Sequence, residues 1–483
     1  MLASALVLVP LGGALAVWIL PLRTARAAGG LALLVALAEL FLWVVVLQNF
    51  DFRSGSLQHG VDVTWFADLD AAYKVGLFDF SLWLVGVTAL VTVAAVAYGM
   101  WVGRERPRAY FGLLLVLLGA TVGVFVAQDL LLFYAFFEAM LVPLYVLVGV
   151  WGGTRRVEAT VKFVTYTLAG SLLMLVAIIA LGLANDTFDM TRLESNGSTW
   201  IFLGFLAAFA VKAPVFPFHG WLPDAYREAP AEVSALLSGV VSKTAAYGML
   251  RIVLPSFPDP VSEWRTVVLA LAAVGLVYGS LLAFRAPDFR GVVAYSSLAQ
   301  MSLIVLGVFA VNDSGLHGAL LHMVNHGLVS AALFLLAGTV ERRAASGRLE
   351  LLGGMARGRP RLASLLLAAA VVSLAVPLST AFAAEFLILN GVFARGWGWA
   401  VVGVTAIVLA AAYMLRLVSA VLHEGIGTAV HPQALDLRPA EVAIVGALVV
   451  ALVALSFWPA GITDHVFAGE LPGVLGAGLE AAP

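Results

Sequence analysis

Residues 109–150 read AYFGLLLVLLGATVGVFVAQDLLLFYAFFEAMLVPLYVLVGV, and this stretch decides the fold class. Only Asp129 and Glu138 are charged in it. A bilayer accepts helices of about 20 apolar residues, because a helix satisfies its backbone hydrogen bonds internally. We therefore interpret the stretch as two consecutive membrane-spanning helices, at residues 109–127 and 129–150.

The composition of the whole chain supports the same interpretation. Hydrophobic residues occupy 62% of the 483 positions and charged residues 12%, whereas roughly a quarter of an average soluble domain is charged. So little polar surface could not cover a water-facing fold. The composition thus excludes a soluble protein and leaves the lipid bilayer as the surroundings of the chain.

Several classes of function are excluded as well. The net charge is −2 and no basic run is interleaved with aromatic residues, so we expect no nucleic-acid partner. The chain has no cysteine, which rules out thiolate-held iron–sulfur clusters and disulfides on it. No nucleotide-binding loop, catalytic triad or haem ligand set is recognisable either. We therefore expect no cofactor and no redox site on this chain.

Hydropathy in windows of about 19 residues predicts an all-α polytopic membrane protein with about fourteen transmembrane helices. We divide it into helices 1–3 at residues 1–102, a first repeat at 109–254, a second repeat at 264–422, and helix 14 with an outer tail at 440–483. The predicted spans are residues 2–21, 28–48, 78–102, 109–127, 129–150, 161–184, 199–218, 231–254, 264–284, 290–311, 316–338, 361–392, 397–422 and 440–462.

The charges of the loops predict the orientation. With the N-terminus outside, about 18 of the 27 Lys and Arg residues fall in inner loops, as the positive-inside rule requires. The outer loops carry acids such as Asp62, Asp186 and Asp259. Both termini should then be outside. The longest gap, residues 50–77, alternates around Val61–Trp65 and predicts a short hairpin or an interfacial stretch.

Four ionisable residues lie where a membrane helix should be apolar. Lys212 and Lys243 are well inside apolar stretches, and Glu138 and Glu385 are deep in two others. A charge in the middle of a span costs roughly 2.5–3.5 kcal/mol even on the lenient insertion scale, so such residues usually mark an ion path. Burial disfavours the ammonium form, so a buried lysine can release its proton near neutral pH, whereas arginine stays charged.

A glutamate near a lysine favours the ammonium form, so a changing distance between them switches lysine protonation. We interpret Glu138, Lys212, Lys243 and Glu385 as proton-carrying groups. The alternative is two structural ion pairs that hold helices in register.

Prolines interrupt two of the predicted spans beside these charges. Pro214 and Pro217 follow Lys212 in span seven, and Pro377 precedes Glu385 in span twelve. A proline removes a backbone donor and frees a carbonyl, which a membrane tolerates only where protein or water meets it. Paired broken helices indicate a transporter built from inverted repeats. We predict two inverted repeats of five helices each, spans four to eight and nine to thirteen.

The histidines are candidates for a proton relay. His322 and His326 are four residues apart and share a helix face, and histidine titrates near neutrality. His219 follows the first break. A metal site is the less favoured reading, because no carboxylate or cysteine completes a ligand set, and structural histidines remain an alternative. Side chains that could hold water between these groups, or simply pack helices, are Ser171, Thr244, Tyr247, Tyr295, Ser296, Ser297 and Gln300.

At these residues the sequence resembles a known family. FYAFFEAMLVPLYVLVGVWGG from Phe133 is similar to helices five and six of the M-type subunits of bacterial NADH:quinone oxidoreductase. The same antiporter-like superfamily includes the L and N subunits, the Mrp cation/proton antiporters and hydrogenase membrane arms. The resemblance runs from about residue 77 to 416. Further matching motifs are VKAPVFPFHGWLPD from Val211, EAPAEVSALL from Glu228, SKTAAYG from Ser242 and AEFLIL from Ala384.

The resemblance implies a role for each buried charge. Glu138 and Lys212 would form the pair between helices five and seven, Lys243 would be the central lysine, and Glu385 the terminal acid toward a neighbouring subunit. L and N subunits have lysine at the position of Glu385, and L subunits carry a lateral helix that we do not expect here. The resemblance thus implies an M-type subunit in the bacterial cytoplasmic membrane, with L- and N-type neighbours, that pumps protons as part of an enzyme reducing quinone elsewhere.

The sequence departs from the family pattern in three places. Gln300 stands where a histidine is common, which puts a relay role of its helix in doubt. Ala384 replaces a more usual glycine, and Leu378–Thr380 replaces a break that contains glycine, so the second break should be stiffer. Other functions remain open: an Mrp-type antiporter subunit, a hydrogenase membrane-arm subunit, or an inert scaffold.

Overall fold

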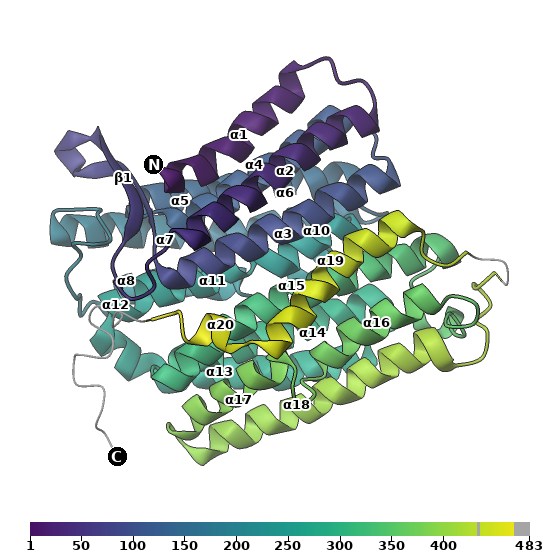
Figure 1. Cartoon of the computed structure of the whole chain (residues 1–483). Coiled ribbons are helices and arrows are strands. Elements are labelled where there is room, and N and C mark those ends of the chain that lie inside the picture. Colours follow the sequence, from purple (N-terminus) through teal and green to yellow (C-terminus); the bar gives the residue numbers. More distant parts are fainter. Residues whose placement is uncertain (432–434, 468–483) are drawn as a thin grey trace.

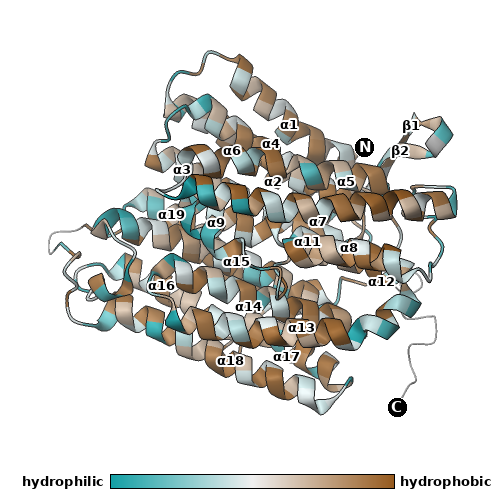
Figure 2. Cartoon of the chain, turned by 180° about the vertical axis from the view of Figure 1, so that it is seen from behind, coloured by the Kyte–Doolittle hydropathy of each residue, from teal (hydrophilic) through white to brown (hydrophobic). Residues whose placement is uncertain are grey.

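The computed structural model describes residues 1–431 and 435–467, which form a bundle of helices lying side by side (Figure 1). Figure 2 shows hydrophobic colour along the lengths of the helices and hydrophilic colour mainly in the loops that join them. Twelve helical stretches of the described residues are long and apolar enough to cross a membrane, and two of them, Leu130–Trp151 and Ala231–Ser256, are runs of shorter helices. The all-α polytopic fold predicted from the sequence is confirmed.

The elements follow one another along the chain with short connections. The strands are β1 Gln58–Phe66 and β2 Ala71–Leu77. The helices are α1 Leu2–Ile19, α2 Ala25–Gln48, α3 Asp79–Val102, α4 Pro107–Val126, α5 Leu130–Ala139, α6 Leu141–Trp151, α7 Arg156–Asn185, α8 Thr199–Lys212, α9 Leu222–Glu228, α10 Ala231–Leu236, α11 Lys243–Gly248, α12 Leu254–Ser256, α13 Pro258–Arg285, α14 Phe289–Phe309, α15 Asp313–Ala344, α16 Pro360–Ser373, α17 Thr380–Phe393, α18 Trp397–Val418, α19 Pro439–Phe457 and α20 Ala460–Thr463.

The twelve helical stretches correspond to twelve of the predicted spans. The other two, at 199–218 and 361–392, contain the shorter helices α8, α16 and α17. Fourteen crossings therefore require α8 and the α16–α17 pair each to cross, and that count stays a prediction. Four boundaries differ by five or six residues: α7 begins at Arg156 rather than 161, α13 begins at Pro258 rather than 264, α15 continues to Ala344 rather than 338, and α19 ends at Phe457 rather than 462. The predicted outer tail beyond residue 467 lies outside the described residues.

Both predicted breaks are present. Pro214 cannot donate to the Ala210 carbonyl, and Val215 N donates to it instead at 2.8 Å. The indole Nε1 of Trp221 donates to the Val211 carbonyl at 2.9 Å, so protein groups satisfy the backbone that the break frees. In the second break α16 ends at Ser373, and the Ser379 hydroxyl caps α17 by accepting from Phe382 N at 3.1 Å.

The enclosed centre of the bundle contains the helices that carry Lys243 and the paired histidines. The most apolar stretches of α15 and of the segment Ala231–Ser256 are entirely buried. A helix surrounded by protein on every side ordinarily has only packing residues. Ionisable side chains in these two elements must therefore find their partners inside the protein.

The predicted hairpin is confirmed, since β1 and β2 pair antiparallel, with Val61 opposite Val75. Both described chain ends lie against this region. The N-terminal amine donates to the His59 carbonyl at 3.3 Å, and the rings of Phe52 and His465 are 4.9 Å apart. The two ends therefore lie on the same face of the bundle, while the assignment of that face to the outside stays a prediction.

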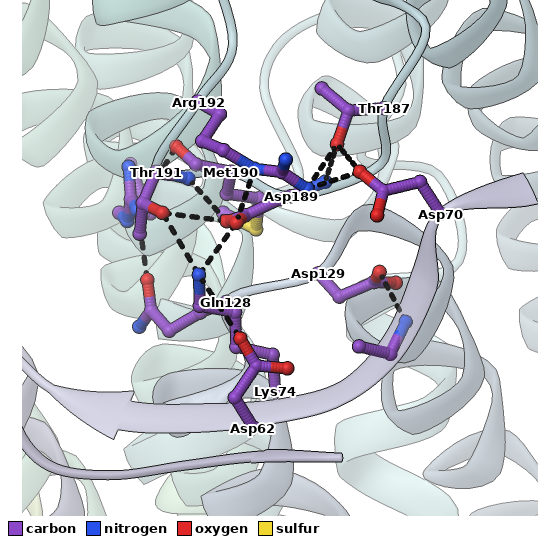
Figure 3. A network of polar contacts seen from close by, with 12 residues as sticks. Asp62, Asp70, Lys74, Gln128, Asp129, Thr187, Asp189, Met190, Thr191 and Arg192 are labelled. Carbon is purple, nitrogen blue, oxygen red and sulfur yellow. Dashed lines mark hydrogen bonds and ion pairs between the residues drawn. The ribbon is translucent and has the colours of Figure 1, made fainter. Parts of the chain in front are cut away.

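A polar network ties the hairpin to the loops before α5 and α8 (Figure 3). Asp189 accepts from Lys74 Nζ at 2.6 Å, from Arg192 Nε at 2.9 Å and from the Thr191 hydroxyl at 2.7 Å. Asp129 caps α5, which carries Glu138, and also accepts from Ala72 N at 3.0 Å. The network therefore fixes the start of α5.

The Asp189 carboxylate should stabilise this region in a pH-dependent way. Burial alone raises the pKa of Asp189, but hydrogen bonds from Lys74 and Thr191 outweigh burial and lower it. Asp189→Asn should therefore lower the stability by about 1–2 kcal/mol at pH 7. A depressed pKa in the folded state contributes stability that is present above the unfolded-state pKa, about 3.9, and is lost as pH falls through the folded-state value.

The measurement is the thermal midpoint of the purified protein in detergent at pH 7 and at about pH 3. The difference between the wild type and Asp189→Asn should be clear at pH 7 and shrink at the acid end. Asp62→Asn is the matched control, because Asp62 is 58% exposed and 3.6 Å from the same lysine. Equal losses in both variants, or a pH-independent loss, would contradict the assignment.

Candidate functional site

Lys243 lies at the first residue of α11, between two π-helical segments, Leu237–Val241 and Met249–Val253. Such turns are rare and often occur at functional sites. The Lys243 side chain is 1% exposed. Its Nζ lies 2.5 Å from the Ser238 carbonyl oxygen and 2.6 Å from His326 Nδ1. The buried amine is therefore held by a carbonyl and an imidazole.

Two glycines bring Lys243 and His326 together. Gly239 belongs to the first π-helical segment, and Gly327 follows His326 on α15. A Cβ atom on Gly327 would stand 2.7 Å from the Gly239 carbonyl oxygen, and one on Gly239 would stand 3.0 Å from that of Gly327. The two backbones are therefore in contact, as small residues allow at membrane helix interfaces.

The predicted histidine pair continues from Lys243 along α15. The rings of His322 and His326 are stacked, with centroids 6.2 Å apart, and both are buried. His322 Nε2 lies 2.7 Å from Gln300 Oε1 on α14, and His322 Nδ1 has no hydrogen-bond partner among the described residues. His317, near the start of α15, has its Nδ1 atom 2.8 Å from the Asp313 carbonyl oxygen and its ring 5.3 Å from that of Phe467.

Gln300 lies between this pair and Glu385. The Glu385 residue on α17 is 3% exposed, and its carboxyl group lies near the Gln300 amide. Its Oε2 atom has no partner within the described part of the chain. Close packing places it there: a Cβ atom on Gly318 of α15 would lie 2.9 Å from the carbonyl oxygen of Ala384. Lys243, His326, His322, Gln300 and Glu385 thus form a line across four helices.

The predicted pair in the first repeat, Glu138 and Lys212, is not in direct contact. Glu138 is half-buried near the end of α5, and Lys212 is the last residue of α8 and 2% exposed. The ion pairs of residues 1–431 and 435–467 include none between them within 4.0 Å. Lys212 Nζ instead lies 4.4 Å from the centroid of the Phe137 ring, a cation–π distance, and Phe137 directly precedes Glu138 on α5. This geometry disfavours the alternative of structural ion pairs.

His219 does not join the line. It lies half-buried in the turn between α8 and α9, where its ring stacks with Phe216 at 5.6 Å and meets Tyr278 edge-on at 5.4 Å. Its Nδ1 atom has no hydrogen-bond partner in the described structure. Among the described residues, no group of three or more His, Asp or Glu side chains is arranged to hold a metal ion.

A family model described as NADH:quinone oxidoreductase/Mrp antiporter, transmembrane, matches residues 127–410. The chain belongs to this family. The chain is 34% identical to subunit M of the NADH-quinone oxidoreductase of Rhodobacter capsulatus over 459 residues, which cover 91% of this chain and 89% of the relative. It is also 34% identical to chain 4 1 of the NAD(P)H-quinone oxidoreductase of a Nostoc species, over 95% of this chain and 89% of that relative.

A family member of known structure has the same fold. A chain of respiratory complex I from Thermus thermophilus, solved with bound NADH, superposes with a TM-score of 0.89 at 28% identity and covers 99% of this chain and 100% of its own length. The resemblance to M-type subunits inferred from the motifs is thereby confirmed. Lys212, Lys243, Gln300 and Glu385, with Glu138 and the two stacked histidines, all lie inside the matched family segment.

Glu39, outside the family segment, is a buried acid that the sequence analysis missed. Glu39 on α2 is fully buried, and neither carboxyl oxygen has a hydrogen-bond partner in the described structure. The signal was available, because a glutamate within the predicted span 28–48 is as unusual as Glu138. Comparison of α2 with the other spans would have found it.

The sequence analysis also missed a buried group of charged and polar side chains around Glu232. The Glu232 side chain on α10 is fully buried and accepts from Arg104 Nε at 2.7 Å, Arg104 Nη2 at 2.8 Å and the Tyr110 hydroxyl at 2.6 Å. A cavity of about 430 Å³ reaches Arg104. The sequence analysis named Glu232 only within the motif EAPAEVSALL, because its position near a predicted helix start did not indicate burial.

Proposed function

We propose that this chain is the proton-translocating M-type subunit in the membrane arm of a bacterial NADH:quinone oxidoreductase. It would lie in the cytoplasmic membrane with both termini outside and with L- and N-type subunits as neighbours. NADH oxidation and quinone reduction would take place on other subunits, since we expect no redox centre or cofactor on this chain. The enzymatic role of the chain would be that of a translocase subunit.

One observation carries this proposal: the buried line from Lys243 through His326 and His322 to Glu385. If these buried residues only held helices together, we would expect ion pairs in which every charged group has a partner. The line instead has lysine and histidine in direct contact at 2.6 Å, and His322 Nδ1 and Glu385 Oε2 have no hydrogen-bond partner among residues 1–431 and 435–467. Unpartnered polar atoms in an enclosed helix are costly unless they exchange protons or water during function.

The proton step follows from the contact between Lys243 and His326. When the ammonium donates, an Nζ–H bond breaks, a bond from hydrogen to His326 Nδ1 forms, and the positive charge moves to the imidazolium. Release of the Nε2 proton toward His322 then restores a neutral ring. Because the two ring centroids are 6.2 Å apart, this second transfer requires a bridging water.

The pair of Glu138 and Lys212 would control the protonation of the buried line that begins at Lys243. When Glu138 comes closer to Lys212, the ammonium form of Lys212 is favoured, and when it moves away, the proton is released. Each proton moved outward against 100 mV costs about 2.3 kcal/mol. The driving energy must come from quinone chemistry elsewhere in the complex, through a conformational or electrostatic change that reaches Glu138.

The alternative functions make different predictions. An Mrp-type subunit, or a subunit of a hydrogenase membrane arm, would be encoded beside the genes of those complexes. The relatives reported above are instead subunits of quinone oxidoreductases, which favours the first proposal. An inert scaffold would keep pumping after the buried charges are neutralised. Co-purification from the native membrane distinguishes these cases by the subunits that accompany the chain.

Substitution of Glu138 tests the proposal. Glu138→Ala should assemble into the complex but lower proton pumping and coupled quinone reduction by about tenfold, because the charge that controls Lys212 is lost. Glu138→Asp should be milder, since it keeps a carboxylate and loses one methylene of reach. The measurement is the proton gradient in proteoliposomes that contain the whole complex.

Glu194→Ala is the matched control, because Glu194 is an exposed acid in the loop before α8. It should pump like the wild type. Full gradients from assembled Glu138→Ala complexes would refute the role of Glu138.

A further inference from the structure

Gln300 occupies the one position in the buried line that cannot titrate. Its side chain is 6% exposed, and its Oε1 lies 2.7 Å from His322 Nε2. The same amide lies near the Glu385 carboxyl group and near the hydroxyl of Tyr413, which is 2.8 Å from the Ser296 hydroxyl.

The chemistry of an amide decides what this contact can transmit. A carboxamide has an oxygen that accepts and an NH₂ group that donates, and neither atom gains or loses a proton near neutral pH. A proton cannot enter at Oε1 and leave from Nε2 without forming the much less stable imidic acid. The side chain of Gln300 therefore lies between His322 and Glu385, hydrogen-bonded to His322, without conducting protons between them.

The same contact fixes the tautomer of His322. Since Oε1 only accepts, neutral His322 must carry its hydrogen on Nε2. Its Nδ1 atom then has a free lone pair and no partner in the described structure. This atom can receive a proton that comes from the Lys243–His326 side. Protonation makes the Nε2–H···Oε1 bond charge-assisted and therefore stronger.

We propose that Gln300 is a positioning residue that holds His322 with Nδ1 free and separates the line into two segments, coupled by charge but not by a shared proton wire. One segment is Lys243, His326 and His322, and the other is Glu385 with Tyr413. A positive charge on His322 stabilises a negative charge on Glu385 across the amide, so each segment reports its protonation to the other. The inference rests on the proposed proton-translocating function.

Titratable and charged groups near Gln300 come from several helices. α11 contributes Lys243, α15 contributes His322 and His326, α17 contributes Glu385 and α18 contributes Tyr413. Two groups on neighbouring helices are engaged elsewhere: Tyr278 of α13 packs on His219, and Arg227 of α9 pairs with Asp288 at 3.0 Å. The pH dependence of this region should therefore depend on the five groups of the two segments.

Two substitutions test the separation in the assembled complex. Gln300→Met keeps a similar volume and removes both polar atoms, so His322 loses its fixed tautomer and quinone-coupled pumping should fall about tenfold. Gln300→His places a group that titrates near neutrality between the segments. It should keep substantial activity but add a new titration to the pH profile of pumping. Histidine tautomers are read by infrared difference spectra of complexes with isotope-labelled histidine.

The outcomes separate this inference from the proposed function. A wild-type pH profile in Gln300→His, together with an unchanged histidine spectrum in Gln300→Met, would overturn the role of Gln300. If Gln300→Met does not assemble, the pH profile of Gln300→His decides alone. Normal pumping by assembled Lys243→Met complexes would refute the proposed function itself, whereas loss of pumping there with no effect at Gln300 would refute only the separation.

Discussion

Replacement of Lys243 by methionine is expected to abolish proton pumping by the complex while leaving its assembly intact. Methionine fills the space of the lysine stem but has no exchangeable proton. The contact with His326 Nδ1 at 2.6 Å would then lose its donor. Removal of a positioned proton-transfer group typically costs 10²- to 10⁴-fold, so pumping should fall by at least about 100-fold and coupled quinone reduction should fall with it.

Lys243→Arg separates charge from titration. Arginine stays protonated at any accessible pH, so it keeps the positive charge and cannot release a proton. Like Lys243→Met, Lys243→Arg should therefore not pump protons. Lys162→Met is the matched control, because Lys162 is 40% exposed and pairs with Asp224 at 2.7 Å near a helix end, where an ion pair contributes little. Pumping by Lys243→Arg at the wild-type rate would show that a fixed charge suffices.

Substitution of Glu385 is expected to have the second-largest effect. Glu385→Gln keeps the side-chain volume and removes the carboxylate near Gln300, so the terminal segment can no longer bind and release a proton. Turnover should slow by about tenfold or more. Glu385→Lys places the opposite charge there: lysine is positive at low pH, where a carboxyl group is neutral, and neutral at high pH, where a carboxylate is negative. Its pH dependence should therefore run in the opposite sense.

The measurement for both variants is the pH dependence of quinone reduction and of proton pumping, after assembly has been checked. Glu424→Gln provides the control, because Glu424 is exposed at the end of the segment that follows α18. Wild-type profiles from both Glu385 variants would remove this residue from the path.

The sequence predicted the spans because a bilayer imposes a local requirement. Each crossing needs about 20 consecutive apolar residues whose backbone is satisfied within the helix, so a stretch such as 109–150 can be interpreted without its neighbours. The breaks after Lys212 and before Glu385 were predicted for the same local reason, since a proline removes a hydrogen bond wherever it stands. The depth of Glu138, Lys212, Lys243 and Glu385 followed from their positions in the spans.

Only the tertiary structure decided which of these charges meet. Gly239 and Gly327, far apart in the sequence, let two backbones come into contact and bring Lys243 to His326. Gln300 stands where the family commonly has a histidine, and the sequence alone left the relay role of its helix in doubt. In the structure Gln300 lies between His322 and Glu385. Lipid is as apolar as a helix surface, so hydropathy specifies neither the rotation of a helix nor its partners. Close packing of small residues sets the rotation, and the rotation decides which buried charges come within reach of one another.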